Sequence, residues 1–183
     1  MGKAIGLLEL KSIPIGIETA DAVLKAANVE LLVATPICPG KYVIIIGGAV
    51  GAVKSAMESG CRVADMYLVC QHTINNVHES VPSARVGTTE VDHVASVGVI
   101  ETLTALTAVQ AADYAAKAAN VRLMEIRVAR GLGGKGFVIL TGEVSSVRSA
   151  VKAALNQLED TGEVTSSCVI PSPHPGLIDK LTN

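Results

Sequence analysis

Aromatic side chains are almost absent from this sequence of 183 residues: only 2% are aromatic, with no Trp and a single Phe. A core made by such a chain has to rely on Ala, Val, Ile and Leu, which suit closely spaced layers of helices and sheets. The mean hydropathy of +0.45 is high, yet no apolar run approaches the ~20 residues that span a bilayer. We therefore expect short buried strands and no membrane partner.

Several chemical signatures are also missing. The formal net charge of −2 provides no basic surface, which argues against a nucleic-acid partner. No Gly-x-Ser-x-Gly or H-E-x-x-H motif occurs, and the histidines lack metal-site spacing. These histidines are His72, His78, His93 and His174. We expect no catalytic residues and no enzyme activity. No apolar leader follows Met1, so a cytoplasmic location is expected.

The four cysteines form no CxxC pair. Residues 61–70 look like one strand, and its length would separate Cys61 from Cys70 by roughly 30 Å, too far for a disulfide. We therefore interpret Cys61, Cys70 and Cys168 as free thiols in or near the core.

The chain contains an internal repeat, which is its most informative feature. The segment 25–29, Lys-Ala-Ala-Asn-Val, returns unchanged at 117–121, and Gly-Leu-Leu-Glu at 6–9 returns as Gly-Val-Ile-Glu at 98–101. Two residues are inserted before Lys135, which matches Lys41. We predict a first domain at 3–80, a linker at 81–94 and a second domain at 95–181.

Each copy shows the same order of elements. In the first copy we predict strands at 3–11, 29–36, 41–47 and 61–70, and helices at 17–28 and 48–60. This β-α-β-β-α-β order is typical of the split βαβ, or ferredoxin-like, arrangement. The predicted fold class is α+β, with two tandem domains that each have a four-stranded antiparallel sheet and helices.

These motifs resemble the bacterial microcompartment (BMC) domain. The resemblance is carried by 25–29, by the helix start Gly-x-Val-x-x-Val-Lys-Ser-Ala at 48–56, and by the ending Cys-Val-Ile-Pro-Ser-Pro-His at 168–174. Two fused copies resemble the tandem-domain shell proteins, and Thr-Pro-Ile-Cys-Pro-Gly at 35–40 resembles those of propanediol-utilisation microcompartments. Ser172 stands where the family often has Arg, which bears on the contacts between tiles.

The resemblance implies a structural shell tile. Three chains would form a homotrimer that mimics a hexamer, and other shell proteins would be its partners. The family's edge lysine, which lies between neighbouring tiles, falls on Lys25 and Lys117.

The resemblance also places the loop between the second and third strands at a central pore. In the first copy this loop is Ile37-Cys38-Pro39-Gly40, and prolines on both sides restrict its backbone. A threefold axis would bring together one Cys38 from each of three chains. The resemblance implies that these thiolates hold a [4Fe–4S] cluster, which would relay electrons or deliver clusters across the shell, with a redox enzyme as a further partner. The residues alone also fit a plain loop cysteine, or Zn²⁺ on three thiolates.

The matching pore loop of the second copy contains Arg130, Gly131, Leu132, Gly133 and Gly134. It satisfies G-x-G-x-x-G through Gly136, but a strand is predicted after it rather than the helix that a dinucleotide site requires. We interpret it as a glycine turn.

Two other functions are compatible with a ferredoxin-like fold. A trimeric, ferredoxin-like protein that binds a nucleotide or another small molecule would use this glycine turn. An acylphosphatase-like hydrolase would need an Arg in the loop at 11–16, which has none. The repeated acids Glu9, Glu101, Asp21 and Asp113 favour structural roles such as capping or tile contact.

Overall fold

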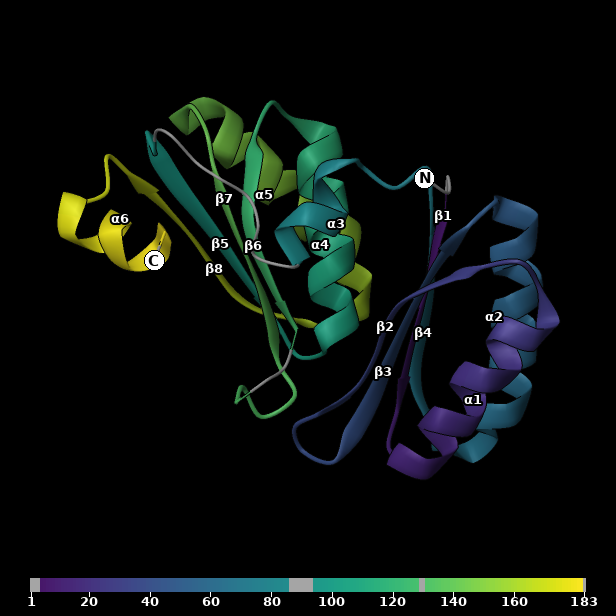
Figure 1. Ribbon diagram of the computed structural model, residues 1–183. Coiled ribbons are helices and arrows are strands. Elements are labelled where there is room, and N and C mark those ends of the chain that lie inside the picture. Colours follow the sequence, from purple (N-terminus) through teal and green to yellow (C-terminus); the bar gives the residue numbers. More distant parts are fainter. Residues whose placement is uncertain (1–3, 86–93, 129–130, 183) are drawn as a thin grey trace. The chain divides into compact units, whose positions relative to one another are not determined.

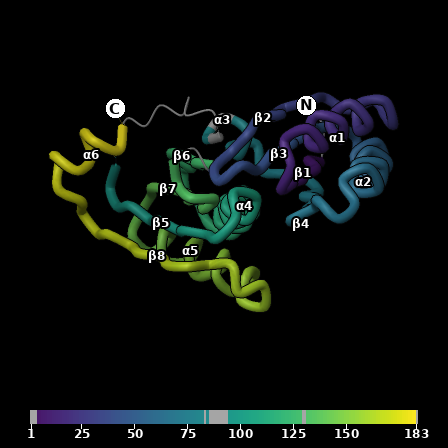
Figure 2. Tube along the Cα trace, turned by 90° about the horizontal axis from the view of Figure 1, so that it is seen from below, coloured from purple at the N-terminus to yellow at the C-terminus, as the bar shows by residue number. Residues whose placement is uncertain are grey.

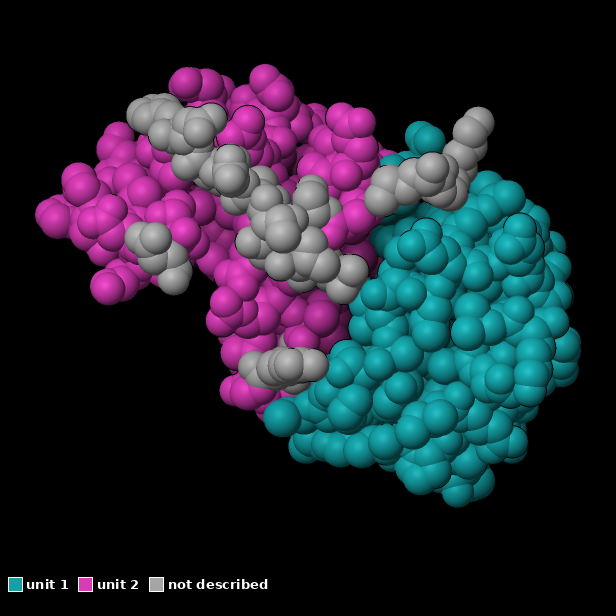
Figure 3. All heavy atoms as spheres, viewed as in Figure 1, with its two compact units in different colours: residues 1–77 teal, residues 78–183 magenta. Residues whose placement is uncertain are grey.

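The computed structural model describes residues 4–85, 94–128 and 131–182. The chain divides into two compact units, Met1–Val77 and His78–Asn183, which are coloured separately in Figure 3.

The first unit has one sheet with two helices on one of its faces (Figure 1). Its elements in chain order are β1 (Ala4–Leu10), α1 (Ile13–Ala26), β2 (Glu30–Ile37), β3 (Lys41–Gly48), α2 (Val50–Ala64), the 3-10 turn η1 (Asp65–Tyr67) and β4 (Leu68–Asn75). The strand order is β2-β3-β1-β4, and all neighbouring strands are antiparallel. This is the predicted split βαβ arrangement.

The second unit repeats this topology, with the order β6-β7-β5-β8. Its elements are α3 (Ser80–Arg85), β5 (Ser96–Thr102), α4 (Ala105–Ala118), β6 (Arg122–Val128), β7 (Gly136–Thr141), α5 (Val144–Leu158), the 3-10 turn η2 (Glu159–Thr161), β8 (Val164–Pro171) and α6 (Pro175–Thr182). Helices α4 and α5 lie on one face of the sheet and α6 on the other, as Figures 1 and 2 both show. The predicted fold class is confirmed.

The core of the first unit lies between its sheet and helices. Alternate residues of β1, such as Leu8 and Leu10, belong to the same cluster of buried side chains as Val53 and Met57 of α2. Side chains of a strand point to opposite faces in turn, so the side chain of Glu9 points to the face away from the helices. Glu9 is nevertheless completely buried.

Helix α1 begins at Ile13, four residues before the predicted start. Pro14 stands in its first turn, where a missing backbone N–H costs nothing because that group has no partner within a helix. The helix was predicted from the spacing of Ile17, Ala20, Leu24 and Ala27. Ile17 and Leu24 are exposed, however, and the buried side is formed by Gly16, Thr19, Ala20 and Val23.

The prediction of a strand at 61–70 was wrong. Helix α2 continues to Ala64, and β4 begins only at Leu68. Cys61 therefore lies on a helix and Cys70 on a strand. Both thiols are half-buried and neither forms a disulfide, whereas Cys168 is exposed on β8 rather than near the core.

The segment predicted as a linker begins with ordered structure. Helix α3 covers its first residues and packs against β6 and α4 of the second unit. Among the described helices, none is both long and apolar enough to cross a bilayer.

Candidate functional site

Cys38 lies at the tip of the hairpin that joins β2 to β3. Ile37 and Lys41 pair across the two strands, so Cys38, Pro39 and Gly40 form the turn between them. Gly40 has a φ of +71°, a left-handed conformation that favours glycine. Ile37 is buried and anchors the end of β2, whereas the thiol of Cys38 is free and exposed. The hairpin thus presents one accessible sulfur atom on a well-anchored base.

An ion pair fixes the base of this turn. The Nζ of Lys41 lies 2.6 Å from Oε1 of Glu9, whose side chain is completely buried. The other carboxylate oxygen of Glu9 accepts from the thiol of Cys70, 3.9 Å away on β4. Glu9 therefore links three neighbouring strands next to the turn. Both residues recur in the second copy, as Glu101 and Lys135, but the sequence alone does not indicate that they pair.

The matching turn of the second copy is built differently. Its residues 129 and 130 lie outside the described residues, and this includes Arg130, which was predicted to line the pore. The next residues form a turn made of Gly131, Leu132, Gly133 and Gly134. The backbone N–H of Lys135 closes it by donating to the carbonyl of Leu132, at 3.2 Å. Strand β7 follows directly, so this turn opens no helix that could hold a pyrophosphate. The interpretation as a glycine turn is confirmed.

Metal binding within one chain finds no support in the parts of the chain that the structure describes. No three His, Cys, Asp or Glu side chains come together there. One chain therefore offers a single exposed thiol at the hairpin, and a site with several thiolates at this point requires Cys38 from more than one chain.

Lys25 and Lys117 occupy the last turns of α1 and α4, where a positive charge complements the helix dipole. Each pairs with the aspartate one turn earlier, Asp21 or Asp113. The two pairs differ in exposure: the side chain of Asp21 is 58% exposed and that of Asp113 only 2%.

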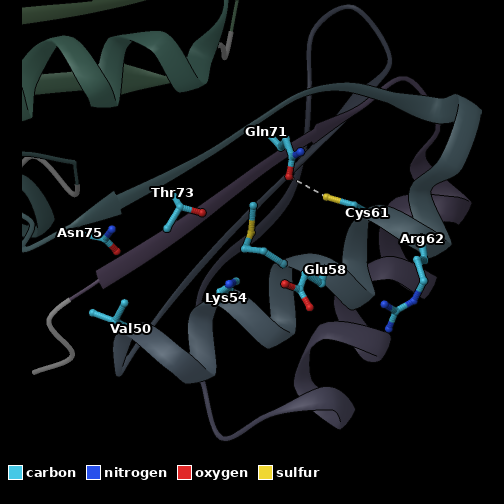
Figure 4. A pocket seen from close by; sticks show the side chains of 9 residues that line it. Val50, Lys54, Glu58, Cys61, Arg62, Gln71, Thr73 and Asn75 are labelled. Carbon is cyan, nitrogen blue, oxygen red and sulfur yellow. Dashed lines mark hydrogen bonds between the residues drawn. The ribbon is translucent and has the colours of Figure 1, made fainter.

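A hollow of about 590 Å³ lies between α2 and β4 of the first unit (Figure 4). Lys54, Glu58 and Arg62 line its helix side, and the thiol of Cys61 donates to Oε1 of Gln71 across it, at 2.7 Å. Burial raises the pKa of the Cys61 thiol, which disfavours the thiolate form that binds metals. The hollow includes no residue of the Cys38 hairpin, and no motif of the sequence indicates it.

Comparison with known proteins agrees with this architecture. The profile of the BMC domain matches residues 4–77 and again residues 96–173. The chain is 43% identical to the bacterial microcompartment shell protein PduT of Citrobacter freundii, over 97% of this chain and 96% of that protein. It is 30% identical to the carboxysome assembly protein CcmO of Synechococcus elongatus, over 97% of this chain and 68% of that protein.

Solved structures show the same relationship. A microcompartment protein from Desulfitobacterium hafniense superimposes with a TM-score of 0.91 at 44% identity, covering 98% of this chain and 99% of that one. The fused permuted hexameric shell protein MSM0275 shares the fold, with a TM-score of 0.63 at 23% identity over 85% of this chain and 81% of that one. The chain belongs to the BMC-domain family of bacterial microcompartment shell proteins and carries two copies of the domain in tandem.

Proposed function

We propose that this chain is a shell tile whose central pore holds an iron–sulfur cluster. Three chains would supply six BMC domains and form a pseudohexameric homotrimer. A threefold axis through the β2–β3 hairpins would bring three Cys38 side chains together, and the second-copy turns would alternate with them around the pore. The observation that carries this proposal is the single exposed thiol at the tip of an anchored hairpin.

The residues present fit a [4Fe–4S] cluster. Soft thiolates are the ligands that iron–sulfur clusters require, and Cys38 is accessible, whereas Cys61 and Cys70 are half-buried on other elements. Three thiolates leave one iron for an outside ligand. When bound, the cluster would supply one-electron redox chemistry at the pore.

The protein itself would contribute position and insulation. The buried Glu9–Lys41 pair and buried Ile37 hold the base of the hairpin, so the thiol position is set by the sheet rather than by a flexible loop. A cluster held there would close the pore and offer a route for electrons, or for the cluster itself, between the two sides of the shell. A redox enzyme at one side would then be a partner.

The outer edge of the tile would contact other shell proteins. Lys25 is well exposed at the end of α1, which suits a contact between tiles. Lys117 is the equivalent residue of the second copy, although its aspartate partner is buried.

The test is anaerobic purification of the native chain, followed by iron and sulfide analysis, absorption and EPR spectra. We expect a brown protein with broad absorption near ~400 nm and about four irons per three chains. Cys38→Ser should lose colour and iron. Cys168→Ser is the matched control, because Cys168 is also exposed but lies on β8, and it should keep both.

A colourless, iron-free trimer would contradict the cluster and leave a plain shell tile. Zinc in place of iron, lost in Cys38→Ser alone, would instead identify a zinc–thiolate site.

A further inference from the structure

The two copies end in equivalent chain turns. Asn76 follows β4 with a φ of 50°, and Ser172 follows β8 with a φ of 49°. Two residues later stands a histidine in each copy. Nδ1 of His78 accepts from the Ser80 N–H at 3.3 Å, and Nδ1 of His174 accepts from the Gly176 N–H at 3.1 Å. Helices α3 and α6, which start there, are therefore structural counterparts.

The first of these helices is firmly docked. Helix α3 packs against β6 and α4, and its Val81 is only 2% exposed. The backbone N–H of His78 donates to Oδ1 of Asp113 on α4, at 2.8 Å. This contact accounts for the burial of Asp113, whose side chain also pairs with Lys117. Within the second unit, β6 and α4 thus form the docking surface for α3, the helix that follows the first BMC domain.

The first unit carries the same surface without such a helix among its described residues. Its counterparts are β2 and α1, on which Asp21 takes the place of Asp113. Asp21 is exposed, and so are the apolar side chains of Ile17 and Leu24 nearby on α1.

The second helix is only loosely held. No residue of α6 is buried, and Leu177, the counterpart of Val81, is 39% exposed. Ile178 and Leu181 rest, partly buried, on an apolar cluster of the sheet that contains Val97 and Ile139. An amphipathic helix with three apolar side chains and no buried one lacks the packing that normally stabilises so short a helix.

We propose that α6 docks on β2 and α1 of a second copy of this chain, as α3 docks on β6 and α4. The backbone N–H of His174 would then donate to the partner's Asp21, and Leu177 would be buried as Val81 is. The partner's carboxylate would lie at the N-terminus of α6, where the helix dipole favours a negative charge. This inference rests on the proposed trimer and names the contact that holds it together.

The contact is head-to-tail: each chain donates one α6 and receives another. A head-to-tail contact closes into a ring when the rotation between copies permits it. The docking of α3 provides the equivalent contact inside each chain, so six quasi-equivalent contacts would complete a ring of three chains.

The test compares charge substitutions on α6 by sedimentation over a range of concentrations. Leu177→Asp should raise the concentration for half-assembly by about tenfold or more, because it removes apolar burial and places an unpaired charge in the interface. Thr182→Asp is the matched control: it adds the same charge to an exposed position of the same helix and should change assembly by less than about twofold. Asp21→Ala should weaken assembly in the same direction as Leu177→Asp.

Hydrogen exchange of the wild-type chain gives an independent measure that depends on no variant. Amides of 174–181 should exchange more slowly in the assembled form than in the dilute monomer. If the wild type assembles while Leu177→Asp assembles equally well, or if these amides exchange at the same rate in both forms, the docking of α6 is wrong and the trimer stands. A wild-type chain that stays monomeric at high concentration would overturn both.

Discussion

At the scale of single residues, the two copies place the same ion pair in different surroundings. Glu9 is completely buried and its partner Lys41 is 22% exposed, whereas Glu101 and Lys135 are both well exposed. Removing one member of a buried pair leaves an uncompensated charge, while an exposed pair contributes little. The repeat therefore provides a matched experiment within one chain.

We expect Lys41→Ala to lower the free energy of unfolding of the first unit by about 3 kcal/mol. Lys135→Ala should cost less than about 1 kcal/mol in the second unit. Urea denaturation of the two variants, followed separately in each unit by hydrogen exchange, measures both. Equal effects would show that Glu9 does not depend on Lys41 for its burial.

Glu101 gives a prediction on pH. Its hydrogen bond from Thr165, and then the hydrogen bond and charge of Lys135, hold the pKa of this carboxyl below its ordinary value. The ionised form is favoured in the folded state, so the stabilisation is present above the unfolded pKa and is lost as the pH falls through the folded pKa. Thr165→Val should raise the pKa of Glu101 towards its ordinary value. An NMR titration of the Glu101 carboxyl that gives the same pKa in both proteins would contradict this.

At the scale of secondary-structure elements, the same helix–strand contact is made in two ways. In the first copy Gly16 of α1 faces Tyr42 of β3, and a Cβ on Gly16 would lie 2.5 Å from the Tyr42 Cβ. The equivalent positions of the second copy hold Ala108 and Gly136, and there a Cβ on Gly136 would lie 2.7 Å from the Ala108 Cβ. Each copy thus has room for a Cβ on only one side of this contact. The glycine lies on helix α1 in the first copy and on strand β7 in the second.

We expect Gly16→Ala to destabilise the first unit by about 1–3 kcal/mol, because a Cβ clash with Tyr42 outweighs the better helix propensity of Ala. In a Tyr42→Gly background, which reproduces the second copy, the same substitution should be neutral or stabilising. A double-mutant cycle on the free energy of unfolding measures this coupling. Additive effects would mean that α1 moves away from β3 without resistance.

Much of the element order could be predicted from the sequence, because the repeat and the alternation of apolar residues mark it. The end of α2 could not. The helix was predicted to end at Gly60, but Gly60 lies inside α2 and is buried, and a Cβ there would meet Leu8 of β1 at 2.8 Å. In the sequence alone, a glycine required by close packing inside a helix cannot be told from a glycine that ends a helix.

The candidate site could be predicted only in part for a related reason. The prolines around Cys38 indicated a turn, and the structure places the thiol at its exposed tip. The buried Glu9–Lys41 pair joins β1 to β3, residues distant in the sequence, and no local pattern indicates such a pairing. The different burial of Asp21 and Asp113 likewise depends on the docking of α3.

At the scale of the whole molecule, family membership confirms that the chain is a structural component of a microcompartment shell and not an enzyme. Two BMC domains in one chain need not be equal, and here they differ at the turn between the second and third strands, in the exposure of Asp21 and Asp113, and in the helices that follow the sheets. These differences fit a division of labour in which the first copy presents Cys38 and the second receives α3.

The measurement that tests the account most directly is native mass spectrometry of the anaerobically purified chain, beside Cys38→Ser. The account predicts a species of three times the 18.8 kDa of one chain plus the mass of one [4Fe–4S] cluster, and a trimer without that added mass for Cys38→Ser. Two results would contradict the cluster-bearing tile. One is a wild-type chain that is monomeric, and the other is a wild-type trimer that lacks the added mass of the cluster.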